Sequence, residues 1–169
     1  MIKLTKFSSN DIPRLISWVP DARSVLQWAG PTYTFDQLED NLTSAVTESI
    51  KQSPTIYMFN ALDTESNKIV GHTQLLKIDF DKKEGRIGKV LICKEYRGQN
   101  FGTNMVEEII AFAFENLSLN RLTLAVYELN LPAIKVYESL GFEKIFLNLD
   151  AVTFNDEKWN AFEMEKLIK

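Results

Sequence analysis

Hydrophobic and polar positions along the first fifty residues predict one strand followed by helices. Residues 2–7 alternate between apolar and polar side chains, which is typical of a strand buried on one face. Residues 11–52 follow a helical pattern that is broken near residues 19–21 and again at Gly30 and Pro31. The longest helix is predicted over residues 35–51, because apolar side chains recur there along one stripe: Leu38, Leu42, Ala45, Val46 and Ile50.

After Pro54 the pattern changes to strands separated by polar turns. β-rich runs bounded by the turns at 63–67 and 81–85 predict three antiparallel strands, over residues 55–61, 68–78 and 86–93. The helical period then returns on both sides of a further strand, which gives helix 103–117, strand 121–127 and helix 131–140. Two more strands are predicted around a polar turn at 154–157, over residues 142–149 and 159–167.

This order of elements predicts a mixed α/β fold. Antiparallel strands followed by a strand–helix–strand crossover require a mixed sheet with helices packed on its faces. The expected strands amount to about seven, so we predict a central mixed sheet with helices on both faces. No internal repeat, low-complexity segment or linker interrupts the pattern, and residues 1–169 are therefore expected to form a single domain.

Composition narrows the function classes. Hydrophobic residues make up 45% and charged residues 25%, the balance of a globular protein, and the net charge of −4 argues against nucleic acid as a partner. The chain has a single cysteine, Cys93, which argues against an internal disulfide and a cysteine-based zinc site. It also has a single histidine, His72, which argues against a metal site built from histidines. No apolar run approaches a membrane span and no signal-peptide pattern opens the chain, so we expect a cytoplasmic protein without a membrane partner.

The stretch that predicts chemistry is the turn between the strand at 86–93 and the helix that follows it. Here Arg97, Gly98 and Gly102 lie directly before and within the start of a helix. Unpaired N–H groups and the helix dipole favour an anion at such a position, and glycines let it approach the backbone. No acidic residue occurs between Arg97 and Val106, although helix starts usually carry one. The pattern therefore predicts a phosphate site, with an ordinary tight turn as the alternative.

Two well-known phosphate motifs do not match this turn: the P-loop and the dinucleotide fingerprint are both absent. The turn instead resembles the acyl-CoA motif of the GNAT acetyltransferase superfamily, Arg/Gln-x-x-Gly-x-Gly/Ala, as Arg97-Gly98-Gln99-Asn100-Phe101-Gly102. The next family signature is also present, with an Asn that starts a helix, a Tyr seven residues later and then Gly-Phe; here these are Asn130, Tyr137, Gly141 and Phe142. The predicted order of strands and helices also resembles that of this superfamily, over essentially the whole chain.

The resemblance implies a GNAT fold, acetyl-CoA as cosubstrate, no metal, and direct transfer of an acetyl group to an amine. It also implies that the strand before the turn bends away from its neighbour and frees its backbone for the pantetheine arm. The residues implied to bind acetyl-CoA are Val90, Leu91, Ile92, Arg97, Gly98, Gln99, Asn100, Phe101, Gly102, Asn130 and Tyr137. Asn100 departs from the family's usual glycine, and we expect its side chain to crowd the diphosphate.

In this family a tyrosine at the position of Tyr137 usually gives a proton to the departing sulfur. Because a phenol is a weaker acid than a thiol, we expect Tyr137 to stabilise the thiolate by hydrogen bonding as much as by donation. The alternative is a helix tyrosine that only packs in the core. Asn130 is expected to cap the helix that starts with Leu131, a role compatible with contact to the coenzyme arm.

The pattern leaves the general base and the acceptor open. His72 and Glu128 are the first candidates for the base, Asp79 and Glu84 are others, and a water relay to a carboxylate is an alternative. Aromatic residues of the first helices are candidates for the walls of the acceptor site: Trp18, Trp28, Tyr33 and Phe35. Core packing is the alternative for each of them, and Cys93 is expected to be a buried strand residue.

The sequence therefore predicts an N-acetyltransferase that acts on a primary amine of a small molecule, peptide or protein. The first alternative is a catalytically silent GNAT-like domain that binds CoA as a sensor or interaction module. A second alternative is an unrelated α/β nucleotide-binding module. For the oligomeric state, we consider a homodimer of this chain.

Overall fold

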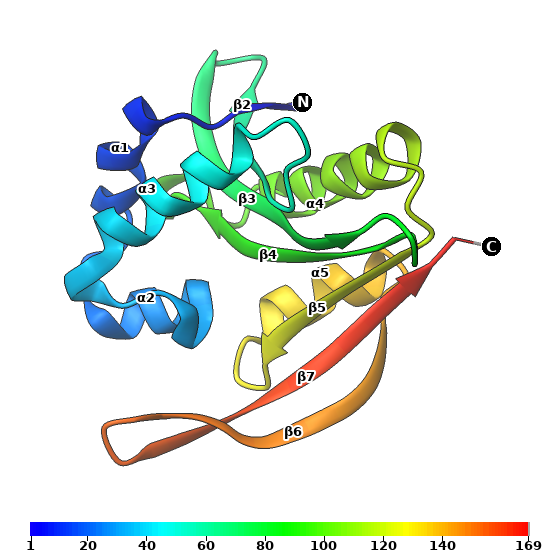
Figure 1. Cartoon of the computed structure of the whole chain (residues 1–169). Coiled ribbons are helices and arrows are strands. Elements are labelled where there is room, and N and C mark those ends of the chain that lie inside the picture. Colours follow the sequence, from blue (N-terminus) through cyan, green and yellow to red (C-terminus); the bar gives the residue numbers. More distant parts are fainter. Residues whose placement is uncertain (169) are drawn as a thin grey trace.

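Seven strands form one mixed sheet in the order β1-β2-β3-β4-β5-β7-β6 (Figure 1). The computed structural model describes residues 1–168. Its strands are β1 (Ile2–Lys6), β2 (Tyr57–Asp63), β3 (Lys68–Asp79), β4 (Glu84–Ile92), β5 (Arg121–Tyr127), β6 (Glu143–Phe154) and β7 (Glu157–Leu167). Neighbours are antiparallel except β4 and β5, which are parallel. The predicted mixed sheet is confirmed.

Helices cover both faces of this sheet, which confirms the second part of the prediction (Figure 1). The helices are α1 (Ile12–Ser17), α2 (Ala22–Ala29), α3 (Leu38–Ser49), α4 (Phe101–Ala111) and α5 (Leu131–Ser139). The first three pack over β2 and β4 through a core that includes Leu42, Met58 and Leu91. The other two pack on the opposite face, where Val106 and Tyr137 join a second core.

The helical stretch predicted near the N-terminus is divided where the sequence indicated. α1 ends before residues 19–21, and Asp21 accepts a hydrogen bond from the Ser24 backbone N–H at the start of α2 (2.8 Å). α3 begins at Leu38, later than predicted, because residues 35–37 form a 3₁₀ turn instead of α-helix. No helix within residues 1–168 combines the length and hydropathy needed to cross a membrane.

The last two strands are longer than predicted and form a hairpin that turns at Asn155 and Asp156. β6 lies at the edge of the sheet and is mostly exposed, so its residues lack the alternation that a half-buried strand shows. The register between β6 and β7 also shifts after Asn148, where Asp150 has a positive φ of 51°. A bulge of this kind interrupts the period on which the prediction of the strand depended.

β4 and β5 pair over a short distance and then separate. Their register contains three residue pairs, the last of which joins Arg86 to Thr123, although β4 continues to Ile92 and β5 to Tyr127. Beyond Arg86, the backbone edge of β4 that faces β5 therefore has no ladder partner in β5. This is the separation that the family resemblance implied for the strand that contains Val90, Leu91 and Ile92.

Candidate active site

The turn from β4 into α4 has the left-handed geometry that its glycines and Asn100 predicted. Gly98 has a φ of +75°, and Asn100, which precedes the first residue of α4, has a φ of 62° and a ψ of 2°. Arg97 Nε donates to the Ile92 carbonyl at 3.0 Å, and Gln99 Nε2 donates to the Glu95 carbonyl at 3.2 Å. These two bonds fold the turn over the end of β4.

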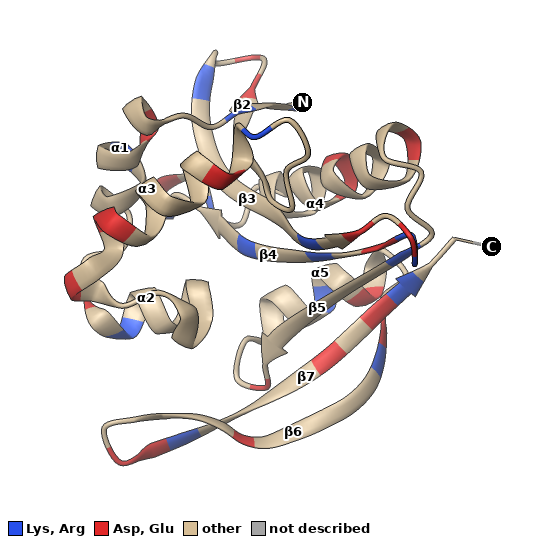
Figure 2. Ribbon diagram, viewed as in Figure 1, with Lys and Arg blue, Asp and Glu red and all other residues tan. Residues whose placement is uncertain are grey.

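The start of α4 is suited to a negatively charged ligand. No side chain caps the helix and its first turn has no acidic residue, so the first backbone N–H groups have no carboxylate beside them. Figure 2 shows the acidic residues of α4 only in its later turns. Gly98 also leaves open space, since a Cβ built there would have no heavy atom within 4 Å.

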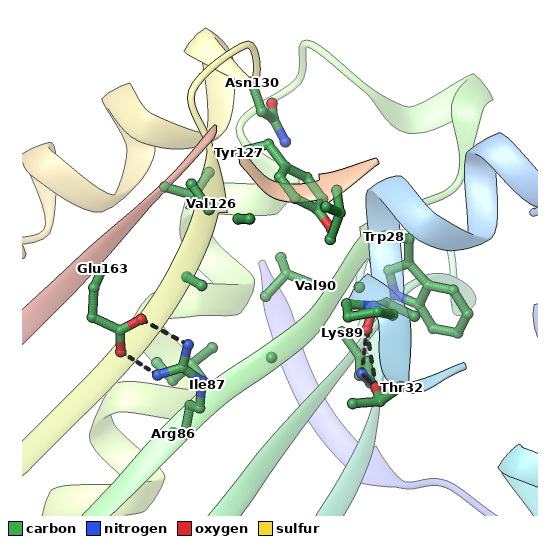
Figure 3. Close-up of a pocket in the computed structure, with 18 of the residues that line it drawn as sticks. Trp28, Thr32, Arg86, Ile87, Lys89, Val90, Val126, Tyr127, Asn130 and Glu163 are labelled. Carbon is green, nitrogen blue, oxygen red and sulfur yellow. Dashed lines mark hydrogen bonds and ion pairs between the residues drawn. The ribbon is translucent and has the colours of Figure 1, made fainter. Parts of the chain in front are cut away.

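A cavity of about 410 Å³ occupies the region where β4 and β5 separate (Figure 3). Its walls come from the end of α2, from β3, β4 and β5, from α5, and from the β6–β7 hairpin. The labelled residues in Figure 3 are Trp28, Thr32, Arg86, Ile87, Lys89, Val90, Val126, Tyr127, Asn130 and Glu163. The cavity therefore has walls from helices on both faces of the sheet, and the unpaired edge of β4 lies beside it.

Three of the residues predicted to bind the cosubstrate line this cavity: Val90, Asn130 and Tyr137. Asn130 caps α5 as predicted, because its side-chain oxygen accepts the Ala133 N–H at 3.3 Å. Tyr137 follows two turns later and is 7% exposed. Burial raises the pKa of the Tyr137 phenol, so it stays protonated near neutral pH.

A family model described as "Acetyltransferase (GNAT) domain" matches residues 2–143. The chain belongs to the GNAT acetyltransferase family. Sequence relatives include the uncharacterized N-acetyltransferase YokL of Bacillus subtilis, 31% identical over 111 residues, or 65% of this chain and 60% of that protein. Another is the spermidine N(1)-acetyltransferase of Vibrio cholerae, 23% identical over 125 residues, or 70% of this chain and 68% of the relative.

Solved structures support the GNAT fold over nearly the whole chain. The spermidine N-acetyltransferase from Vibrio cholerae in complex with CoA and spermine superimposes with a TM-score of 0.81 at 19% identity, covering 98% of this chain and 95% of that one. The chain spans 60% and 48% of the length of the first two curated relatives that it matches. At these identities the structures establish the shared fold.

The other residues predicted to bind the cosubstrate do not line the cavity. Arg97, Gly98, Gln99, Asn100, Phe101 and Gly102 form the turn and the start of α4. Leu91 packs into the core beneath the N-terminal helices, and the Ile92 side chain packs near Met105. The contacts proposed for the β4 residues involve the backbone alone, so this packing is compatible with them.

His72 does not line the cavity, although it packs behind Trp28, which does. Its ring is fully buried, 4.7 Å from the Phe7 ring centroid and 6.1 Å from that of Trp28. Burial lowers the pKa of His72 to about 3, and the charge of Arg14 adds to this effect. An imidazole in this environment is a poor proton acceptor for an incoming ammonium group, so we do not carry His72 forward as the base.

The carboxylates considered as bases also lie outside the cavity walls. Glu128 accepts a hydrogen bond from Asn160 Nδ2 at 2.9 Å. Asp79 accepts the Lys82 backbone N–H at 2.9 Å, and Glu84 forms an ion pair with Arg121 at 2.8 Å. The carboxylate that does line the cavity is Glu163, which is bound to Arg86 through both oxygens.

The aromatic candidates of the first helices have different positions. Trp28 lines the cavity, and Tyr33 packs beside it with ring centroids 6.1 Å apart. Trp18 lies beneath the Arg14 guanidinium and Phe35 is 43% exposed, and neither lines the cavity. The acceptor wall that the sequence suggested therefore reduces to Trp28 with Tyr33 behind it.

Sequence reasoning missed Lys89, Tyr127 and the Arg86–Glu163 pair, all of which line the cavity. Lys89 had a readable signal, because it is a charged residue between Ile87-Gly88 and the apolar run Val90-Leu91-Ile92. The Arg86–Glu163 pair joins residues far apart in the sequence, so no local pattern indicated it. Burial raises the pKa of Tyr127, whose side chain is labelled at the cavity in Figure 3.

Proposed function

We propose that this GNAT domain transfers an acetyl group from acetyl-CoA directly to a primary amine. The observation that supports this most strongly is the cavity between β4 and β5, which has Tyr137 in its wall and the unpaired edge of β4 beside it. The diphosphate would bind the N–H groups at the start of α4, and the pantetheine arm would follow the backbone of Val90 into the cavity. The names of the sequence relatives support the same reaction.

The reaction makes two demands on the residues of the site. The amine nitrogen attacks the thioester carbon, and the carbonyl oxygen gains charge that backbone N–H groups of β4 can stabilise. The carbon–sulfur bond then breaks, and the thiolate leaves with the electron pair. We assign Tyr137 to that sulfur, since its protonated phenol donates a hydrogen bond to the thiolate as charge develops.

The amine must also lose a proton, and we propose that water carries it away. Glu163 is the cavity-lining carboxylate, and both of its oxygens already accept hydrogen bonds from the Arg86 guanidinium. A water relay requires no buried base beside the thioester. It also agrees with the positions of His72 and Glu128 outside the cavity walls.

The decisive experiment pairs acetyl-CoA binding by calorimetry with thiol release across a panel of primary amines. We expect acetyl-CoA to bind and at least one amine to accelerate release well above hydrolysis. Binding without release for any amine would favour the silent CoA-binding alternative, for which the acetyltransferase names of the relatives offer no support. Absence of binding would contradict the proposal itself.

We also propose that the chain self-associates in the cytoplasm as a homodimer. β6 is an edge strand with exposed apolar side chains, and a solved relative is described as a dodecameric spermidine N-acetyltransferase. These side chains are Ile145 (42% exposed), Phe146 (56%), Leu147 (37%) and Leu149 (67%). An exposed apolar edge of this kind favours pairing with another chain. Sedimentation equilibrium should give twice the monomer mass, and Phe146→Glu should shift the mass toward monomer.

A further inference from the structure

Lys89 sits at a bulge in the central strand beside the cavity. His72 pairs with Leu91 and Gln74 with Gly88, so Lys89 and Val90 together lie opposite Thr73 alone. Lys89 also has a φ of 53°, which is strained for a residue with a long side chain. Bulges re-aim side chains, and strained residues concentrate at functional sites. The bulge turns Lys89 toward the end of α2.

The Lys89 ammonium is held in place by neutral groups. Its Nζ donates to the Ala29 carbonyl and to Thr32 Oγ1, the latter at 2.7 Å (Figure 3). It also lies 4.4 Å from the centroid of the Tyr33 ring. A lysine ammonium has three N–H donors, and these contacts use two of them. Among the described residues no oxygen accepts the third N–H, which has the Tyr33 ring nearby, and Lys89 lines the cavity.

The charged residues that line the cavity are predominantly positive. Three are basic, Lys77, Arg86 and Lys89, whereas Glu163 is the single acidic one among the described residues. Arg86 and Glu163 neutralise each other through both carboxylate oxygens, which leaves the two lysines. Burial lowers the pKa of Lys89 to about 8, with contributions from Arg86 and Lys77, so Lys89 is mostly protonated at pH 7. Figure 2 shows the basic residues along the middle of β4.

A wall of this charge is unsuited to a second ammonium group on the acceptor. Like charges repel each other at short range, and more strongly in a partly buried site than in water. A polyamine would bring such a charge without finding a free carboxylate among the cavity-lining residues. The wall is suited to the opposite case, an acceptor with a negative group that takes the third N–H of Lys89.

We propose that the acceptor is an amine that also carries a carboxylate, such as an amino acid or a small peptide, and that Lys89 binds this carboxylate. The inference rests on the proposed function and names the acceptor class for the same site. It differs from the acceptors for which several of the relatives are named, which are spermidine and spermine. The carboxylate would be held on the α2 side of the cavity, with the amine directed toward the thioester.

The test compares carboxylate-bearing amines with their carboxamides. Thiol release is measured for a series of α- and ω-amino acids and dipeptides, each paired with its carboxamide, and for spermidine and spermine. We expect at least one carboxylate to exceed its carboxamide about tenfold to a hundredfold in kcat/KM, the range of a charge-assisted hydrogen bond. Both polyamines should be poorer acceptors than that carboxylate.

Substitution of Lys89 gives the residue-level test. Lys89→Met should remove most of the preference for the carboxylate over its carboxamide, mainly through KM for the carboxylate. The matched control is Lys68→Met, which removes the same charge at the exposed start of β3 and should keep the preference. If Lys89→Met does not fold, the wild-type comparison of carboxylates with polyamines decides the matter.

Three results would overturn the inference. Higher kcat/KM for spermidine or spermine than for every carboxylate would do so and leave the acetyltransferase proposal standing. Equal losses for carboxylate and carboxamide in Lys89→Met would mean that Lys89 only ties α2 to β4. Absence of thiol release with every amine would overturn the inference together with the proposed function, and calorimetry with acetyl-CoA separates these cases.

Discussion

At the scale of single residues, Tyr137 combines a position in the cavity wall with a phenol that stays protonated. Its hydroxyl is the proton-bearing group that we assign to the departing sulfur. Tyr137→Phe retains the ring that packs against Phe142, at a centroid distance of 6.0 Å, and removes only the hydroxyl. We therefore expect the fold and acetyl-CoA binding to persist, while kcat falls about 10²–10⁴-fold, the usual contribution of a general acid. Steady-state kinetics with calorimetry measures both, and a loss below threefold would assign Tyr137 to packing alone.

The buried histidine predicts how stability depends on pH. His72 has a folded pKa of about 3 against an ordinary value of 6.5, so below pH 6.5 the unfolded chain binds a proton that the folded chain does not. Stability is therefore full above pH 6.5 and falls as the pH drops from 6.5 toward 3. Between pH 7 and pH 5 the free energy of unfolding should decrease by about 2 kcal/mol.

The control uses the fact that the chain has a single histidine. His72→Gln should flatten the dependence between pH 7 and pH 5, whatever its effect on absolute stability. Carboxylates whose pKa values are lowered in the folded state, such as Asp11 and Asp63, act below this window. Denaturant titrations at several pH values measure the slope, and an unchanged slope in His72→Gln would contradict the assignment.

Residue-level prediction succeeded where a role depends on local sequence and failed where it depends on burial. Asn130 was predicted as a cap because capping is decided within three residues, and its bond to Ala133 follows. His72 was a candidate base because its ordinary pKa suits the task, but the packing of Phe7 and Trp28 around it is not visible in the sequence. The partners of Lys89 were likewise not visible in the sequence, since Ala29, Thr32 and Tyr33 lie about sixty residues earlier, at the end of α2 and just after it.

At the scale of elements, the turn before α4 depends on two residues in the left-handed region. Asn100→Gly removes a side chain from this turn and relieves a backbone conformation that costs about 1 kcal/mol for most residues. We expect tighter acetyl-CoA binding by calorimetry, because the diphosphate gains space beside the helix start. Unchanged or weaker binding would argue against crowding by Asn100.

The second left-handed position gives a contrasting prediction. Gly98→Ala adds a methyl group that meets no neighbouring atom, but it does so at a φ of +75°, which an alanine rarely adopts. The free energy of unfolding should fall by about 1 kcal/mol. Urea denaturation checks this value, and no loss of stability would show that the turn can move to another conformation.

The order of elements could be predicted because each has its own period and its own turn residues. The separation of β4 from β5 could be expected only from the family resemblance. Pairing between parallel strands joins residues far apart in the sequence and leaves no local pattern. The full length of β6 could not be predicted, because an exposed edge strand with a bulge does not alternate.

At the scale of the whole molecule, a ligand that binds the folded chain should stabilise it. The proposed site draws on α2, β4, β5, α5 and the turn before α4, so acetyl-CoA would join elements from both faces of the sheet. At 100 times its dissociation constant it should add about 2.7 kcal/mol, or roughly 5–10 °C in Tm for a domain of this size. Thermal shift measurements check this, and protection by ATP or NAD in place of acetyl-CoA would favour a nucleotide-binding module.

Cys93, at the end of β4, has a consequence for spectroscopy. It is the only cysteine of the chain, is 8% exposed, and directs its thiol to Glu95 Oε2 at 2.6 Å. Burial and the neighbouring carboxylate both raise the pKa of this thiol, and thiols react as thiolates. Maleimide dyes should therefore label the natural chain slowly. A cysteine introduced at an exposed position outside the apolar edge, such as Asp156 in the β6–β7 turn, would be the fast-reacting one. A single fluorophore there could report movement of the hairpin beside the cavity without removal of the native thiol.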